Sequence, residues 1–120
     1  MRSLLAIALS LALASPAAAQ DAASLRRGQA LLERNCSGCH AVGAKGDSPN
    51  PAAPPMRELH RRYSIDNLAE ALAEGMLTGH PAMPEFEFPP NDVKAIIVYL
   101  KSIQTGQQAA LRVHPLRHVN

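Results

Sequence analysis

The sequence Cys36-Ser37-Gly38-Cys39-His40 lies in the first third of the chain and decides how the rest of it is interpreted. It has the pattern C-x-x-C-H. Two thiols three positions apart can both bond to vinyl groups at one edge of a haem, and the histidine that follows is then placed under the iron. The motif therefore predicts a haem attached covalently through Cys36 and Cys39, with His40 as its proximal ligand.

The same two cysteines have other possible uses. A C-x-x-C pair can also form a structural disulfide, bind zinc or carry out thiol redox chemistry. A disulfide between Cys36 and Cys39 would close a very small loop, which stabilises a fold little. A thioredoxin-like domain needs alternating strands and helices, and the sequence around the motif shows no such alternation. Haem attachment is the favoured interpretation, and a haem-free metal or thiol-redox protein is the alternative.

The first residues have the features of a secretory signal peptide. Residues 1–3 are a short basic start, residues 4–14 are apolar except for Ser10, and residues 17–19 are three alanines that suit a signal peptidase. This pattern predicts cleavage before Gln20. The apolar run is shorter than the roughly 20 residues needed to span a bilayer. We therefore expect a signal peptide at 1–19 and a periplasmic mature protein without a transmembrane segment.

The length of the mature chain allows one small domain, and its composition provides few aromatic side chains for a core. With the signal peptide removed, 11 Lys and Arg face 10 Asp and Glu, and this near-neutral balance argues against a nucleic acid as partner. The chain has no Trp, and its aromatic residues are Tyr63, Phe86, Phe88 and Tyr99. Aromatic side chains usually supply large blocks of core area. A buried porphyrin would fill the space that they leave.

Helical periodicity predicts a first helix that runs from Ser24 into Cys36, because apolar residues recur at helical spacing. The residues of this stripe are Leu25, Gly28, Leu31 and Leu32. Gly28 in a helix interior costs about 1 kcal/mol relative to Ala. A packing reason, such as a second helix that crosses closely at this point, would explain it.

Two further helices are predicted beyond a loop at 41–55 and a short helical turn at 56–63. The second helix is expected after Ser64 as N-cap, with Gly75 as its stop. The last is expected to be capped by Asn91 or Asp92. Its expected buried face consists of Val93, Ile96, Ile97, Leu100 and Ile103, with Tyr99 beside it. Residues 76–90 are predicted to be a loop, and residues 105–120 a flexible tail.

A second iron ligand is expected across the ring from His40. The candidates are Met56, Met76, Met83, His60, His80, His114 and His118. Met83 is favoured because Pro81 and Pro84 restrict the backbone on either side of it, and because His and Met together are an established ligand pair of haem iron. The alternative role for Met83 is that of an adaptable core residue. Met56 suits an apolar contact with the ring edge, and His60 and His80 are expected at the surface.

From about Ala22 to Gln104 the chain resembles the bacterial class I mono-haem cytochromes c. The matching marks, in order, are Gly28, the C-x-x-C-H motif, Ala53-Pro54-Pro55-Met56, Gly75, Met83-Pro84 and Tyr99-Leu100. The resemblance implies an all-α domain at 20–104, in which three main helices and their loops wrap around one haem c. It implies that the first and last helices cross, with Tyr99 against Gly28. It also implies that the carbonyl of Pro54 accepts a hydrogen bond from Nδ1 of His40.

The function implied is that of a one-electron carrier, not an enzyme, in a periplasmic electron-transfer chain. Iron held by both His40 and Met83 has no open site for a substrate, so the partners would be a redox protein donor and acceptor. Two alternatives have the same sequence features. One is a haem subunit of a larger periplasmic dehydrogenase or oxidase, and the other is a gas-binding haem sensor in which Met83 is displaced.

Charge is distributed unevenly along the chain. Residues 20–62 carry seven basic and four acidic side chains. Residues 63–92 carry six acidic side chains and no basic one, and residues 93–120 carry four basic side chains and no acidic one. The surface around Met83 should therefore be acidic. We hypothesise that this asymmetry orients the protein at its partner. The alternative is a set of ordinary solvated helix faces.

Overall fold

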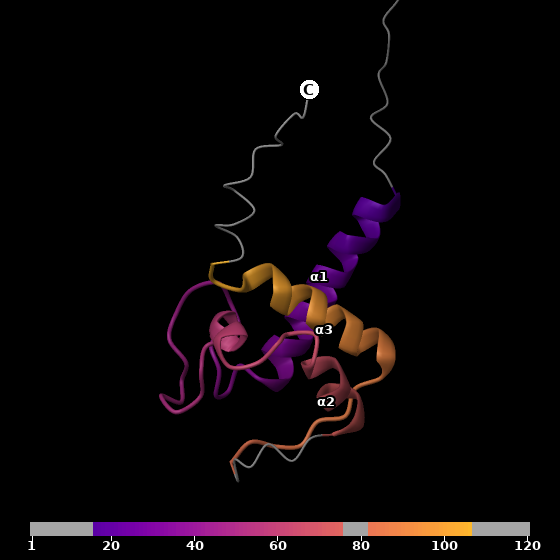
Figure 1. The fold of residues 1–120 in the computed structure, drawn as a ribbon. Coiled ribbons are helices and arrows are strands. Elements are labelled where there is room, and N and C mark those ends of the chain that lie inside the picture. Colours follow the sequence, from indigo (N-terminus) through magenta and orange to yellow (C-terminus); the bar gives the residue numbers. More distant parts are fainter. Residues whose placement is uncertain (1–15, 76–81, 107–120) are drawn as a thin grey trace, which may run out of the picture.

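The computed structural model describes residues 16–75 and 82–106. Within them the chain forms α1 (Pro16–Asn35), the 3₁₀ helix η1 (Met56–Arg61), α2 (Leu68–Glu74) and α3 (Pro90–Ile103), and no strand (Figure 1). The prediction of an all-α fold is confirmed. In these ranges no helix combines the length and the apolar character that a bilayer crossing requires. Met76, His80 and the tail beyond Gly106 lie outside the described residues.

Helix α1 carries the predicted stripe into the core. Gly28 and Leu32 are buried, and Leu25 and Leu31 are partly buried against the same cluster. The helix begins at Pro16, four residues ahead of Gln20, where signal cleavage is predicted. The cleavage itself stays a prediction.

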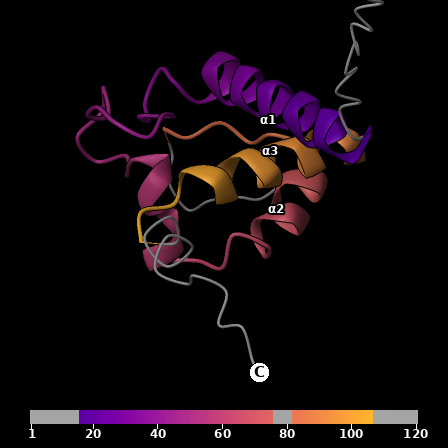
Figure 2. The same ribbon diagram turned by 90° about the horizontal axis from the view of Figure 1, so that it is seen from above.

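Helices α1 and α3 cross in direct contact at Gly28 (Figures 1 and 2). A Cβ atom placed on Gly28 would lie 2.1 Å from the carbonyl oxygen of Ala95 and 2.7 Å from Cβ of Tyr99. No residue larger than glycine fits without moving one helix, which confirms the predicted crossing and the position of Tyr99. Beside this crossing, the guanidinium of Arg27, the residue before Gly28, bonds to the carboxylate of Asp92, one turn before Ala95 in α3.

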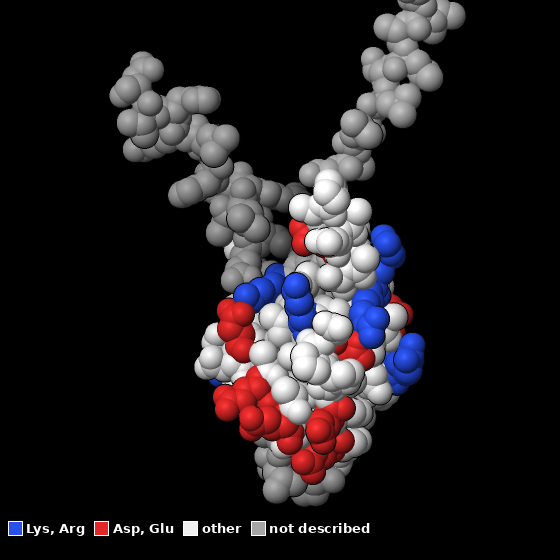
Figure 3. Space-filling view, turned by 90° about the vertical axis from the view of Figure 1, so that its right-hand side faces the viewer, with Lys and Arg blue, Asp and Glu red and all other residues white. Residues whose placement is uncertain are grey.

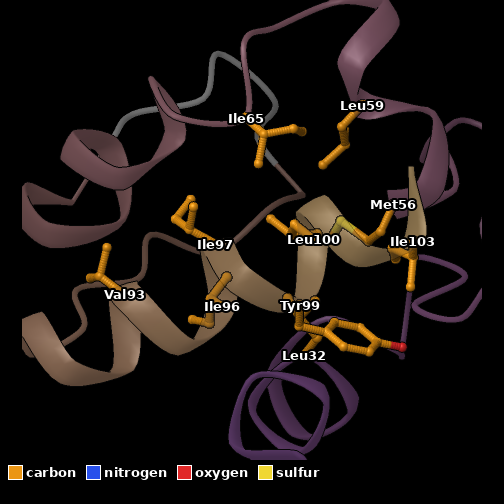
Figure 4. Packing of buried hydrophobic residues seen from close by; sticks show 10 residues of the cluster. All are labelled: Leu32, Met56, Leu59, Ile65, Val93, Ile96, Ile97, Tyr99, Leu100 and Ile103. Atoms are coloured by element: carbon orange, nitrogen blue, oxygen red, sulfur yellow. The ribbon is translucent and has the colours of Figure 1, made fainter. Parts of the chain in front are cut away.

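Helix α3 is the centre of the molecule, because apolar residues pack on both of its sides (Figure 4). Leu32 of α1 lies on one side, and Leu59 and Ile65 lie on the other. The predicted buried face is confirmed: Val93, Ile96, Ile97, Leu100 and Ile103 are all at most 9% exposed. In Figure 2, α3 lies between α1 and α2.

The predicted start of the second helix is wrong. Residues 64–67 form successive turns in which the amides of Asn67 and Leu68 bond to the carbonyls of Ser64 and Ile65, three residues back in each case. The regular helix α2 begins only at Leu68, and no side chain caps it. Its predicted end is confirmed, since Gly75 has φ +74°, a conformation that glycine adopts readily.

The predicted cap of the last helix is also wrong. Helix α3 begins at Pro90 after an extended Pro89, and neither Asn91 nor Asp92 lies at the N-cap position. Proline suits the first helical turn because its missing N–H would have no partner there. The carboxylate of Asp92 pairs with Arg27 of α1.

Candidate haem-binding site

The C-x-x-C-H motif occupies a turn that continues α1 beyond its last helical residue. The amide of Cys36 donates to the carbonyl of Leu32 at 2.8 Å, which prolongs the helical pattern. The amides of Cys39 and His40 then both donate to the carbonyl of Cys36, at 3.2 and 2.9 Å. Cys36, Cys39 and His40 therefore belong to one compact turn at the end of the helix that crosses α3.

Both cysteines are free thiols, and they differ in exposure. Cys36 is half-buried against the core cluster, whereas Cys39 is exposed. Burial raises the pKa of the Cys36 thiol from 9.0 to about 11. The nucleophile of thiol redox chemistry is a thiolate, and reactive cysteines have lowered pKa values. The surroundings of Cys36 thus oppose the thiol-redox alternative.

The imidazole of His40 is fixed through one of its two nitrogen atoms. Its Nδ1 atom lies 2.7 Å from the carbonyl oxygen of Pro54. A carbonyl oxygen can only accept, so Nδ1 carries a proton, and in the neutral ring the lone pair is then on Nε2. A neutral imidazole in this tautomer has the form that binds a metal through Nε2, and a carbonyl on Nδ1 increases its strength as a donor.

The loop that supplies Pro54 is held to the motif and to α3 by hydrogen bonds. The amide of Asn50 donates to the carbonyl of Cys39 at 3.1 Å, and the amide of Met56 donates to that of Ala41 at 2.9 Å. The hydroxyl of Tyr99 donates to the carbonyl of Val42 at 3.0 Å. Pro54 therefore reaches His40 on an ordered loop, although residues 41–55 contain no helix or strand.

Met83 lies on a separate segment, residues 82–89, whose later part lies beside α2 (Figure 1). The amide of Phe88 bonds to the carbonyl of Leu72 at 2.8 Å, and the side chain of Glu85 packs on Gly75. Met83 is 36% exposed and does not belong to the buried core. The structure thus brings Cys36, His40 and Pro54 together, while Met83 is presented from another element.

The other ligand candidates within the described residues occupy different environments. Met56 is 5% exposed and belongs to the apolar core. His60 lies at the surface of η1, as predicted, and its Nδ1 lies 3.0 Å from Oε1 of Gln104. Met76, His80, His114 and His118 lie outside the described residues.

One buried polar residue was not anticipated from the sequence. Gln104 was assigned to the last position of the domain at the edge of a polar tail, and it is 0% exposed. Its side chain bonds to η1 and to α3. No local pattern identifies such a residue, because a glutamine after a helix is ordinarily solvated.

The side chains that are present suit a covalently attached haem. Two free thiols share one turn, the next residue is an imidazole with an available Nε2, and an exposed thioether comes from a different segment. Thiols, imidazole and thioether are the groups by which proteins attach haem and ligate its iron.

Comparison with known proteins points to the same cofactor. The family model for cytochrome c matches residues 25–104, a range that includes the C-x-x-C-H motif, Pro54 and Met83. A protein from Synechocystis sp. named "Cytochrome c-553-like" is 29% identical over 77 residues, which cover 64% of this chain and 67% of the relative. No solved structure matches the chain significantly.

Proposed function

Since this chain belongs to the cytochrome c family, whose cofactor is a covalently bound haem c, we propose that it is a one-electron carrier of a periplasmic electron-transfer chain. Its iron is ligated by His40 and Met83. The observation that carries the proposal is the contact between Nδ1 of His40 and the Pro54 carbonyl, directly after two free thiols on the same turn. This arrangement leaves Nε2 as a metal-binding atom of fixed orientation.

Each candidate residue has a distinct role in the proposal. Haem c supplies an iron that accepts and releases a single electron. Cys36 and Cys39 hold it through thioether bonds, and His40 donates Nε2 to the iron. The carbonyl of Pro54 keeps the proton on Nδ1 and so prevents the ring from flipping or changing tautomer.

Met83 completes the ligand set from the segment beside α2. Met83 is 36% exposed, so its side chain is not enclosed in the apolar core. A thioether ligand favours ferrous iron and raises the reduction potential, as does burial of the ring. If His40 and Met83 both hold the iron, no ligand position would remain for a substrate, and the protein would act by exchanging electrons with other redox proteins.

The location of this activity follows from the predicted signal peptide. We propose that residues 1–19 are removed on export, that residues 20–104 form the haem domain, and that residues 105–120 are a tail without a part in haem binding. Mass spectrometry of the periplasmic protein tests this assignment. A mass that corresponds to a chain beginning at Gln20 and carrying one haem is expected, and a retained leader would contradict it.

Absorption spectra of the purified protein, oxidised and reduced, test the function. We expect a haem that acid and acetone do not extract, a methionine–iron charge-transfer band in the ferric protein, and a positive midpoint potential. Carbon monoxide binding to the reduced protein at neutral pH would contradict the carrier and favour a gas sensor. Co-purification of a larger catalytic subunit would identify a haem subunit of a dehydrogenase or oxidase.

A further inference from the structure

Gln104 lies between the end of α3 and η1, the 3₁₀ helix that follows the loop after His40. It follows Ile103, the last residue of α3, and its side chain is 0% exposed. Long polar side chains are seldom fully buried, because burial without hydrogen-bond partners costs free energy. The partners of this amide therefore show what the burial achieves.

The amide of Gln104 uses its full hydrogen-bonding capacity. Oε1 accepts from the backbone amide and from Nδ1 of His60, both at 3.0 Å. Nε2 donates to the carbonyls of Met56 and Leu100, at 2.9 and 2.8 Å. Two carbonyls can only accept and a backbone amide can only donate, so these partners fix which end of the amide is oxygen.

These bonds hold η1 to α3 near both ends of the 3₁₀ helix. Met56 begins η1 and His60 lies in its last turn. A neighbouring backbone bond, from the amide of Thr105 to the carbonyl of Arg57 at 3.0 Å, joins the same two elements. The hydrogen bonds within a 3₁₀ helix have poorer geometry than those of an α-helix. Because η1 is also short, its position depends on such contacts with the rest of the protein.

The start of η1 in turn positions the group that orients His40. The carbonyl of Pro54 accepts from Nδ1 of His40 at 2.7 Å, and only Pro55 separates Pro54 from Met56. Proline has φ fixed near −65°, so this connection is short and has little freedom. A displacement of Met56 would therefore move the Pro54 carbonyl relative to the imidazole.

We infer that Gln104 is a positioning residue for His40. Gln104 acts through Met56 and Pro54 to hold the hydrogen bond from Nδ1 of His40 to the carbonyl of Pro54. The inference rests on the proposed role of His40 as an iron ligand. A strong hydrogen bond from Nδ1 makes the imidazole a better donor, which favours ferric iron. Gln104 thus lowers the reduction potential from a position outside the ligand set.

Two substitutions of Gln104 test this role in the haem-loaded protein. Gln104→Leu removes all four hydrogen bonds at similar volume, and Gln104→Glu keeps the acceptor for His60 but cannot donate to the Met56 carbonyl when ionised. We expect Gln104→Leu to raise the equilibrium constant for reduction roughly threefold to tenfold, where tenfold corresponds to about 59 mV for one electron. Gln104→Glu adds a negative charge that by itself favours ferric iron, so its effect is judged from the His40 hydrogen bond and not from the potential.

The matched control is Ile97→Ala, which removes core volume from α3 at a residue that is 9% exposed and makes none of these hydrogen bonds. It should lower the unfolding temperature and leave the potential unchanged. A second readout is the exchange of the His40 Nδ1 proton with deuterium, followed by nuclear magnetic resonance of the reduced protein. Exchange should be faster in both Gln104 variants and unchanged in the control.

Gln104 variants that unfold at a lower temperature but keep the native potential and proton exchange would overturn the inference. If Gln104→Leu fails to fold, the exchange of the His40 Nδ1 proton in Gln104→Glu decides. The proposed function is judged separately, from the ligand spectrum of the unmodified protein, which does not depend on Gln104.

Discussion

Tyr99 is a single residue that joins the loop of the haem motif to the crossing of the two long helices. Its Cβ lies against Gly28 and its hydroxyl donates to the carbonyl of Val42, two residues after His40. Burial, and secondarily the negative charge of Glu33, raise the pKa of Tyr99 above its ordinary value of 10.0. The fold therefore favours the neutral phenol.

We predict that Tyr99→Phe lowers the free energy of unfolding by about 1 kcal/mol at pH 7, because a neutral hydrogen bond is lost. The substitution should also change the alkaline stability. Because the pKa of Tyr99 is higher in the folded state, this residue contributes to the free energy of unfolding. The contribution is complete below pH 10.0 and is lost as the pH rises through the folded-state pKa. Urea unfolding of both proteins between pH 7 and pH 11 measures the difference. Equal pH slopes would contradict this account of Tyr99.

At the scale of the elements, the contact between α1 and α3 depends on the missing side chain of Gly28. The carbonyl of Ala95 takes the space that a Cβ atom would need, so the two backbones touch. This contact places the C-terminal end of α1, and with it Cys36 and His40, at a fixed position against the core. Helix α3 then links this end of the molecule to η1 through Gln104.

We predict that Gly28→Ala destabilises the protein by about 3 kcal/mol or more, because the added methyl group forces the helices apart. Gly43→Ala is the matched control, since a Cβ there would meet only ordinary contacts at 3.8 Å or beyond. Thermal unfolding and the yield of haem-loaded protein measure the effect. A Gly28→Ala protein as stable as the Gly43→Ala protein would contradict the close crossing.

The elements that the sequence predicted well are those with a repeated apolar pattern. Helix α3 has such a pattern over four turns, and its buried face was predicted residue by residue. The errors fall at helix ends, where one side chain has several possible partners. Asp92 has the right chemistry for a cap and pairs with Arg27 because α1 crosses there. Ser64 begins a turn, since the residues after it bond three positions back.

The site residues divide in the same way. The spacing of the C-x-x-C-H motif alone predicts Cys36, Cys39 and His40 as haem-binding residues. The contact of His40 with Pro54 was expected only from the family resemblance. Gln104 could not be found from the sequence, because its partners in η1 lie more than forty positions away and nothing local distinguishes it from a solvated glutamine.

On the face of the molecule that Figure 3 shows, acidic side chains gather at one end, whereas basic side chains, with some acidic ones among them, lie nearer the other end. We define the acidic surface as Glu70 and Glu74 of α2 with Glu85 and Glu87 of the Met83 segment, all of which are exposed. Two other carboxylates of the region are neutralised, because Asp66 pairs with Lys101 at 2.6 Å and Asp92 pairs with Arg27. The acidic surface thus lies on the two elements next to the proposed Met83 ligand.

We predict that this surface attracts cationic redox partners and that salt screens the attraction. Electron transfer to a small cationic complex, hexaammineruthenium(III), should slow as ionic strength rises. Combined Glu85→Gln and Glu87→Gln substitutions should lower the rate constant severalfold at low salt. Combined Asp21→Asn and Asp47→Asn substitutions, which change the net charge equally, should have a smaller effect. Rates that ignore ionic strength, or equal effects of both pairs, would contradict the prediction.

A pair of methionine variants tests most directly whether Met83 is the second ligand of the iron. The ferric absorption spectrum of Met83→Ala is compared with that of Met56→Leu, which replaces a buried core methionine with a side chain of similar volume. We predict that the methionine–iron charge-transfer band disappears in Met83→Ala, with a lower midpoint potential, and that both are native-like in Met56→Leu. A Met83→Ala protein that keeps the band and the native potential would contradict the account.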